Sequence, residues 1–268
     1  MTNYDKQSRR LEKLKTERDE ALASLKKSET ERSRLYSILD GIMHETRRTN
    51  SEIASACEDV SKSIANQNYN QASHDAEDAF YSSGLISSRL TFADFEINPD
   101  SISRQTKYTA GIYKKFDKAR RILFRAAKNK GVNVIIQGPS RNEIEVLPAF
   151  ELVPFVLIDN AIKYSPNNQD VQVQVTDNPS QETRVQVVIS SVGPMVPTEE
   201  LSTLTMRGKR GSHALKSNIP GEGIGLYLAD TLIRLANGRL ELSSSQSVLY
   251  SFNGIGYSAF VASIQFKQ

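Results

Sequence analysis

The stretch LIDNAIKYS (residues 157–165) mixes apolar and polar residues in a pattern typical of a helix with one functional face. On a helix, Asn160, Lys163 and Tyr164 are three and four residues apart and therefore share that face. Val156, one turn upstream, continues the face as an apolar position. The amide oxygen can bind Mg²⁺, the ammonium can meet phosphate, and the phenol can stack or donate a hydrogen bond. This favours a phosphate-binding face, although an ordinary helix end that turns polar as it leaves a core has the same pattern.

A second stretch, GEGIGLYLADTLIRLANGRLEL (residues 221–242), opens with three glycines at alternate positions. Gly221, Gly223 and Gly225 leave backbone amides unshielded where a helix begins, which is an arrangement that binds phosphate. The Asn-Gly pair that follows is typical of a left-handed helix cap. A dinucleotide-binding motif requires a strand directly before its glycines, and a long polar loop stands there instead. Taken alone, the three glycines could equally be a flexible turn.

The two stretches, in this order and about 60 residues apart, resemble the ATPase domain of the histidine kinase, gyrase, Hsp90 and MutL superfamily. LIDNAIKYSP is similar to the N box of that superfamily, and GEGIGL is similar to its G2 box. SSVGPMVPTEE (residues 190–200) stands in the place of the G1 box. The resemblance covers roughly residues 95–268. It implies a Bergerat-type ATP-binding fold with the nucleotide beneath a mobile loop over residues 194–222.

The resemblance also implies roles for individual residues. Asn160 would coordinate Mg²⁺, Lys163 and Tyr164 would contact the phosphates, and the glycines would cradle them. Arg207 and Arg210 are candidate phosphate contacts from the loop, although solubility explains these arginines equally well. The implied nucleotide-binding residues are Asn160, Lys163, Tyr164, Ser191, Gly193, Arg210, Gly221, Gly223, Gly225 and Leu226.

A third stretch, LDGIMHETRRTNSEI (residues 39–53), carries a histidine in a heptad pattern. Ile42 faces the seam, so His44 falls on the outside of the helix, where a phosphate donor and a later acceptor can both reach it. Glu45 could take the imidazole proton as a general base, and Arg48 is one turn away. The motif resembles the H box of the histidine-kinase dimerisation domain. The alternative is an exposed histidine on a charged helix.

The chain departs from the family pattern at three places. The family has Asn or Glu at the position of Val156, and an Asp that accepts the adenine amino group at the position of Ser191. Losing that charge-assisted hydrogen bond would weaken nucleotide binding by about 1–2 kcal/mol, or roughly tenfold. In the H box, Asn50 and Ser51 replace the usual proline. The N and G1 boxes are therefore degenerate, which leaves the activity open.

The N-terminal third predicts long helices. Residues 1–66 lack proline and contain only one glycine, and their apolar residues recur at heptad spacing. A turn is expected over 64–71 and a second helix over about 72–92. Two such helices cannot enclose a core, so we expect a dimeric four-helix bundle, with Cys57 buried or half-buried in the seam. The heptad residues are Tyr4, Leu11, Leu25, Leu39, Ile53 and Val60 in one register, with the polar exceptions Arg18, Arg32 and Thr46, and Leu14, Ala21, Leu35, Ile42 and Ala56 three residues later.

The rest of the chain predicts an α+β sandwich, in which helices cover one face of a mainly antiparallel or mixed sheet. The complete expectation is a coiled-coil helix (1–38), a dimerisation and histidine phosphotransfer hairpin (39–94) and an ATP-binding catalytic domain (95–268). The elements expected in that domain are helices over about 111–130, 148–164 and 223–237, strands near 132–137, 170–176, 184–190, 239–245 and 256–266, and a loop over 192–222.

Composition restricts the location and the partners. The 268 residues are 38% hydrophobic and include one cysteine, no run of about 18 apolar residues and no apolar leader at the N-terminus. We therefore expect a cytoplasmic protein without a membrane span. The net charge of +3, with basic residues interleaved among acidic ones, argues against nucleic acid.

The resemblance implies a two-component histidine kinase, which would use ATP and Mg²⁺ to phosphorylate His44. The phosphoryl group would then pass to an Asp on the receiver domain of a response regulator. Because no sensor domain is evident, an upstream sensor could act through the N-terminal coiled coil. The alternative is a weak or inactive dimeric relay or scaffold that retains the ATPase fold. An ATP-driven clamp fits poorly, since such clamps need the carboxylate that Val156 replaces.

Overall fold

The computed structural model describes residues 3–98, 105–217, 219, 221 and 223–267. It divides into two compact units, Met1–Arg48 and Thr49–Gln268, each of which is considered by itself. Helix α1 (Asn3–Ala65) provides the whole first unit and continues into the second. Among the described residues, no helix combines the length and the hydropathy that crossing a bilayer requires.

The first unit is a solvated helix with an apolar stripe. The heptad residues Leu14, Leu25 and Leu39 are 58%, 57% and 48% exposed in the single chain. A polar helix of this length gains little from its own contacts, so such a stripe is stabilised only when another surface covers it.

The hairpin of the second unit joins the end of α1 to α2 (Tyr69–Ile97) and confirms the expected turn. Gln67 has a left-handed backbone with φ of 57°. Asn68 caps α2 by accepting a hydrogen bond from the Gln71 backbone N–H at 3.2 Å. The Ser63 hydroxyl donates to Asp75 across the hairpin at 3.1 Å. The expectation for Cys57 is wrong, because its side chain is exposed while the neighbouring Ala56 is buried.

Helix α2 runs past the end that the sequence predicts, because its last turn belongs to another core. Phe95 is 3% exposed and is part of the hydrophobic core of the ATPase-like region. Its ring lies 6.0 Å from the ring of Tyr227. Further along α2, Gly84 packs against Ile122 so closely that an added methyl group would lie 2.9 Å from it.

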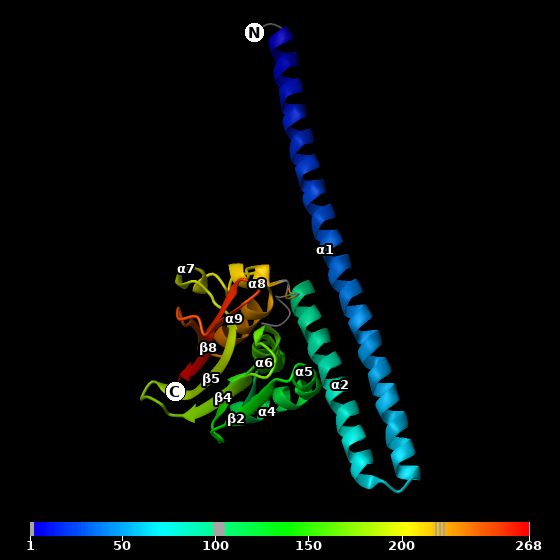
Figure 1. Cartoon of the computed structure of the whole chain (residues 1–268). Coiled ribbons are helices and arrows are strands. Elements are labelled where there is room, and N and C mark those ends of the chain that lie inside the picture. The colour runs from blue at the N-terminus through cyan, green and yellow to red at the C-terminus, as the bar shows by residue number, and fades with distance from the viewer. Residues whose placement is uncertain (1–2, 99–104, 218, 220, 222, 268) are drawn as a thin grey trace. The chain divides into compact units, whose positions relative to one another are not determined.

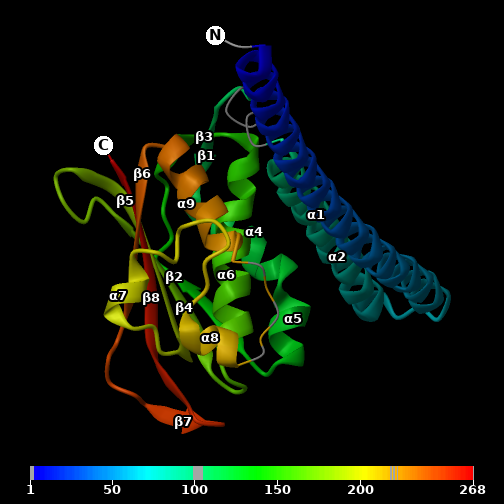
Figure 2. The same cartoon turned by 90° about the horizontal axis from the view of Figure 1, so that it is seen from above.

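A six-stranded mixed sheet with helices on one face confirms the predicted fold class (Figure 1, Figure 2). The strand order is β2-β4-β5-β8-β6, with β7 pairing β8; β2 and β4 are parallel and the other pairs are antiparallel. In β4 every second residue from Val171 to Val175 is buried, as the period-two pattern predicts. The strands are β2 (Asn133–Gln137), β4 (Asp170–Asp177), β5 (Thr183–Pro194), β6 (Gly238–Ser244), β7 (Tyr250–Phe252) and β8 (Ile255–Lys267).

The helical layer lies on the buried face of this sheet, as Figure 2 shows. The helix predicted over 111–130 is interrupted, because the chain bends at Leu123 and buries its side chain to 2% exposure. The helix predicted over 148–164 begins with a 3₁₀ turn. The helices are α4 (Ile112–Ile122), α5 (Phe124–Asn129), η1 (Pro148–Glu151), α6 (Leu152–Tyr164) and α9 (Gly225–Leu235).

Two further strands, β1 (Tyr108–Gly111) and β3 (Glu143–Val146), form a small antiparallel sheet. Nearby, Glu151 accepts hydrogen bonds from Lys115 Nζ at 2.5 Å and from Lys118 Nζ at 2.6 Å. Burial acts to raise the pKa of Glu151, but the two lysines together hold this pKa below its usual range. The ion pairs thus join α4 to the start of α6.

Replacing Glu151 by Gln is expected to lower the free energy of unfolding by about 1 kcal/mol at pH 7, since the pairs are partly exposed. A carboxylate with a depressed folded pKa stabilises the protein above its unfolded pKa of about 4.3, and this contribution is lost as the pH falls through the folded value. Urea unfolding should therefore separate wild type from E151Q at pH 7, and the difference should shrink as the pH falls below about 4 toward the folded pKa. The exposed Glu145→Gln serves as the control, and an E151Q defect that persists undiminished at pH 3 would contradict the assignment.

Candidate nucleotide-binding site

The structure brings the N-box-like helix and the glycine-rich turn together. A methyl group added at Gly225 would lie 2.9 Å from Val156 Cγ1 and 3.5 Å from Asn160 Nδ2. One added at Gly221 would lie 2.7 Å from Lys163 Nζ. The start of α9 thus rests directly on α6, and only glycine permits this approach. The two sequence stretches form one corner of the molecule.

The polar face of α6 is the part of that helix that stays accessible. Asn160, Lys163 and Tyr164 are half-buried, while Val156 is 7% exposed beneath Gly225. The Lys163 ammonium lies 5.5 Å from the centroid of the Tyr164 ring. All three lie within helix α6, where spacings of three and four residues place them on one face, as predicted. Asp159 is half-buried as well. Leu226, at the start of α9, is partly buried and packs against the core.

Lys130, just after α5, fixes the end of α6 that carries this face. Its Nζ donates hydrogen bonds to the carbonyl oxygens of Ile162, at 2.9 Å, and of Lys163. These carbonyls belong to the last turn, where no backbone N–H is available to them. Burial lowers the pKa of Lys130; the Asp159 carboxylate opposes this and the Lys163 charge adds to it. No local pattern predicts this role for Lys130, because its partners lie more than thirty positions away in the sequence.

The G1-like segment lies at the end of strand β5. Ser191 pairs with Phe260 of β8, and Gly193 pairs with Ser258. Alternation along β5 places Ser191 on the same side of the sheet as the buried Ile189, which is the side covered by the helices. An added methyl group at Gly193 would lie 3.6 Å from Tyr164 Cβ. The G1-like segment therefore adjoins the polar end of α6.

The segment between β5 and α9 contains two short helices, α7 (Thr198–Leu201) and α8 (Ser212–Lys216). Arg210 donates from Nη2 to the carbonyl oxygens of Ala214, at 3.4 Å, and of Ile219. Its Nε and the His213 Nδ1 are buried without a hydrogen-bond partner among the described residues. Arg207 is exposed. Residues 218, 220 and 222 lie outside the described part of the chain.

These groups fit a magnesium nucleotide. A triphosphate needs cations and N–H donors, and Lys163 beside Gly221 and the amides of the glycine turn supply both. Mg²⁺ at phosphates takes most of its ligands from phosphate oxygens and water, so the one amide oxygen of Asn160 suffices. Val156 adds no polar atom to the corner.

His44 and Glu45 lie within α1, in the unit Met1–Arg48. Their side chains are outside the described part of the structure.

Comparison with known proteins identifies the ATPase region. Residues 149–266 match the family model "Histidine kinase-, DNA gyrase B-, and HSP90-like ATPase". The chain is 34% identical over 101 residues to the adaptive-response sensory kinase SasA of Synechococcus sp. (strain JA-2-3B'a(2-13)), a match over 38% of this chain and 26% of SasA. It is 31% identical over 88 residues to the probable sensor kinase SilS of Salmonella typhimurium, covering 33% of this chain and 17% of SilS.

Among solved structures, full-length ShkA in complex with AMPPNP is similar with a TM-score of 0.48 and 13% identity, over 74% of this chain and 39% of ShkA. The chain spans about a quarter or less of the two curated relatives described above. The part of the chain that matches the ATPase model, residues 149–266, contains the α6–α9 corner, and the chain is similar over that part to sensor kinases.

Proposed function

We propose that this chain is an ATP-dependent histidine kinase of a two-component system, with the nucleotide held at the α6–α9 corner. The observation that carries the proposal is the close contact of Gly221 and Gly225 with Lys163 and Asn160, which gathers a cation, an amide oxygen and open backbone amides in one place. ATP supplies the phosphoryl group, and Mg²⁺ neutralises part of its charge.

Each site residue then has a separate task. Asn160 ligates Mg²⁺, Lys163 and Tyr164 contact the phosphates, and Ser191 and Gly193 lie at the adenine end of the site. The other groups at the phosphates and over the nucleotide are Arg210, Gly221, Gly223, Gly225 and Leu226.

The acceptor is His44. A ring nitrogen of His44 attacks the γ-phosphorus, the bond from that phosphorus to the bridging oxygen breaks, and ADP leaves. Glu45 takes the proton that the imidazole loses. The phosphoryl group then passes to an Asp on a receiver domain.

The helical part, proposed as a coiled coil (1–38) and a hairpin (39–94), forms a homodimer. Support comes from the exposed heptad leucines, which only a partner helix can bury. The same coiled coil would receive a signal from an upstream sensor, and residues 95–268 would act as the catalytic domain.

A second candidate function is a dimeric relay or scaffold with little turnover. Val156 favours it, because an apolar side chain packs against Gly225 where the family has a polar one.

His44→Ala is expected to abolish incorporation of acid-labile phosphate from γ-labelled ATP, because no other histidine has the H-box neighbours. Binding of a non-hydrolysable ATP analogue should be unchanged, since the substitution lies outside the ATPase domain. His74→Ala, at an exposed position on α2, is the matched control. Equal labelling of H44A and wild type would refute the acceptor assignment. Analogue binding without any labelling of wild type would support the relay.

A further inference from the structure

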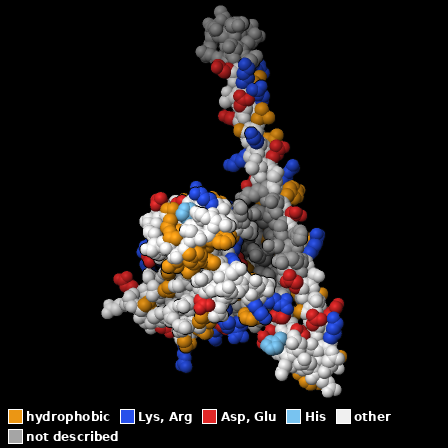
Figure 3. Space-filling view, in the orientation of Figure 1, with side chains coloured by type: hydrophobic (Ala, Val, Ile, Leu, Met, Phe, Trp, Pro, Cys, Tyr) orange, Lys and Arg blue, Asp and Glu red, His pale blue; other side chains and the backbone are white. Residues whose placement is uncertain are grey.

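A basic segment, residues 112–130, comprises α4 and α5. It contains eight Lys or Arg residues and one Asp, a net charge of +7 in a chain whose total is only +3. The remainder of the chain is therefore net negative. The expectation that basic residues are interleaved with acidic ones is wrong for this segment. Figure 3 shows Lys and Arg side chains gathered over α4 and α5.

The outward face of α4 presents a regular row of cations. Lys114, Lys118 and Arg121 are all exposed and are spaced four and three residues apart, so they form one stripe. The inward face carries Ile112, Phe116 and Ala119, all buried. The stripe is thus held rigidly by a packed helix.

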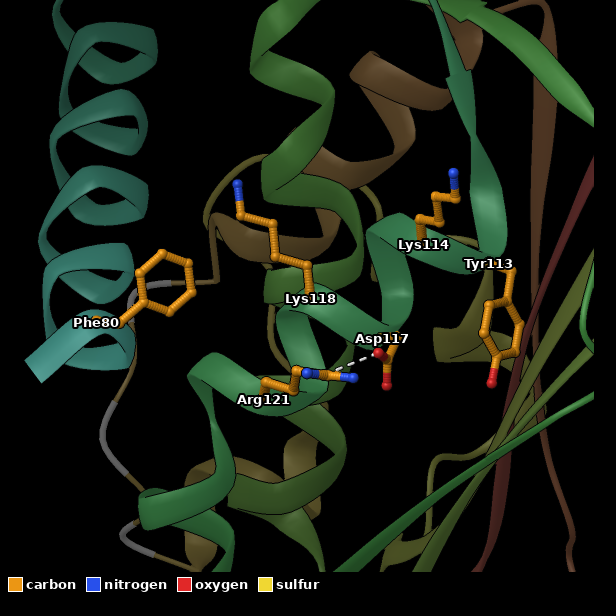
Figure 4. A pocket seen from close by; sticks show the side chains of 6 residues that line it. All are labelled: Phe80, Tyr113, Lys114, Asp117, Lys118 and Arg121. Atoms are coloured by element: carbon orange, nitrogen blue, oxygen red, sulfur yellow. Dashed lines mark hydrogen bonds and ion pairs between the residues drawn. The ribbon is translucent and has the colours of Figure 1, made fainter. Parts of the chain in front are cut away.

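This stripe borders a pocket of about 260 Å³ between α4 and α2, lined by Phe80, Tyr113, Lys114, Asp117, Lys118 and Arg121. In Figure 4, Phe80 reaches from α2 toward α4, and the Lys118 side chain extends toward α2, whereas Arg121 is directed toward Asp117. Phe80 is 63% exposed. Aromatic surface beside arginine is the composition of protein-binding hot spots.

Neighbouring carboxylates neutralise only part of this charge. Asp117 receives hydrogen bonds from Arg120 and Arg121, and Glu151 is shared by Lys115 and Lys118. Arg125 pairs with Asp78 of α2. Glu52 and Asp75 also act electrostatically on Arg125. The seven cations of this surface therefore outnumber the five described carboxylates around them, which leaves a net positive surface around an aromatic pocket. Those cations are Lys114, Lys115, Lys118, Arg120, Arg121, Arg125 and Lys128.

We propose that the α2–α4 pocket and its stripe bind an acidic segment of a partner protein. The segment would place carboxylates opposite Lys114, Lys118 and Arg121 and insert one apolar side chain beside Phe80. A protein fits better than a membrane, because the pocket has only two aromatic side chains among four charged ones, and Asp117 would repel an anionic lipid surface. It fits better than nucleic acid, because the rest of the chain is net negative.

The proposal goes beyond the kinase function and is tested without ATP. A displayed library of random 12-residue peptides is selected on the full chain and counter-selected on the double variant Lys114→Glu/Lys118→Glu. Enriched peptides should be rich in Asp and Glu and contain an apolar residue. The best peptide should bind the double variant at least about tenfold more weakly than wild type, and binding should weaken with salt. Phe80→Ala, which leaves the net charge unchanged, should weaken binding of the same peptide several-fold.

The matched control is Lys107→Glu/Lys267→Glu, which changes the net charge equally at two other exposed positions. Circular dichroism establishes that all variants are folded. Enrichment of neutral or basic peptides, no enrichment at all, or equal loss in the control overturns the proposal. The proposal is also overturned if the stripe variants weaken binding to phosphatidylglycerol vesicles or to a DNA duplex but do not weaken binding to peptides.

Discussion

Asn160→Ala is expected to remove the Mg²⁺-dependent part of ATP binding. A triphosphate carries about four negative charges, and without a shared cation those charges oppose entry into a half-buried corner. Asn160 supplies an amide oxygen on the accessible face of α6, whereas Val156, one turn earlier, supplies none. With no second polar ligand on that face to compensate, we expect a loss of about tenfold to a hundredfold, or about 1.4–2.7 kcal/mol.

Titration calorimetry with a non-hydrolysable ATP analogue, in Mg²⁺ and in EDTA, measures this effect. Wild type should bind more tightly in Mg²⁺, and N160A should bind equally in both. Asn129→Ala, an exposed asparagine at the end of α5, should behave as wild type. An N160A protein that keeps the full Mg²⁺ effect would show that the metal is held elsewhere.

Gly223→Ala is expected to weaken nucleotide binding by at least about tenfold and to destabilise the segment over the site. Gly223 has φ of 73°, and an added methyl group would lie 2.5 Å from the Lys209 carbonyl oxygen. That contact is with backbone, so either the glycine turn or the segment around Lys209 must move. The hydrogen bond from the Gly208 N–H to the Gly223 carbonyl, 3.0 Å long, lies in the same place.

Gly254→Ala separates crowding from backbone strain. Gly254 has nearly the same φ, 75°, but an added methyl group meets nothing within 4 Å. Both variants carry the strain of a left-handed alanine, about 1 kcal/mol, and only G223A carries the steric conflict. Thermal melts and analogue titrations on both proteins would therefore differ. If the two variants lost equal stability and bound the analogue equally, the contact with Lys209 would have no role in the site.

Local patterns were sufficient for the main elements of the ATPase domain. The alternation in β4 and β5 and the helical spacing of α6 and α9 each extend over eight or more residues, so their periods are unmistakable. Strands β1, β3 and β7 have only three or four residues, too few for a period to show, and their pairing depends on distant partners. The bend at Leu123 could not be predicted either. No Pro or Gly stands there, and the bend accompanies the burial of the Leu123 side chain in the core.

Features of the candidate site that depend on spacing along one helix could be predicted from the sequence. Features that depend on packing between distant segments could not. The shared face of Asn160 and Lys163 follows from helix geometry. The role of Lys130 cannot be predicted from the sequence, because a lysine that caps a distant helix has the same local pattern as any surface lysine. The exposure of Cys57 was mispredicted because Cys57 lies one residue past the seam position Ala56, which is buried while Cys57 is exposed.

The burial of Phe95 bears on how the protein opens under thermal fluctuation. Amides exchange with solvent through local unfolding, and residues that share a core become exposed together. The last turn of α2 would therefore exchange at the slow rate of α6 and α9, whereas the turn near Gln67 would exchange quickly. The amides of this one hairpin would thus show two different levels of protection from hydrogen exchange. The change from one to the other would mark where the helical hairpin ends and the core of the sheet region begins.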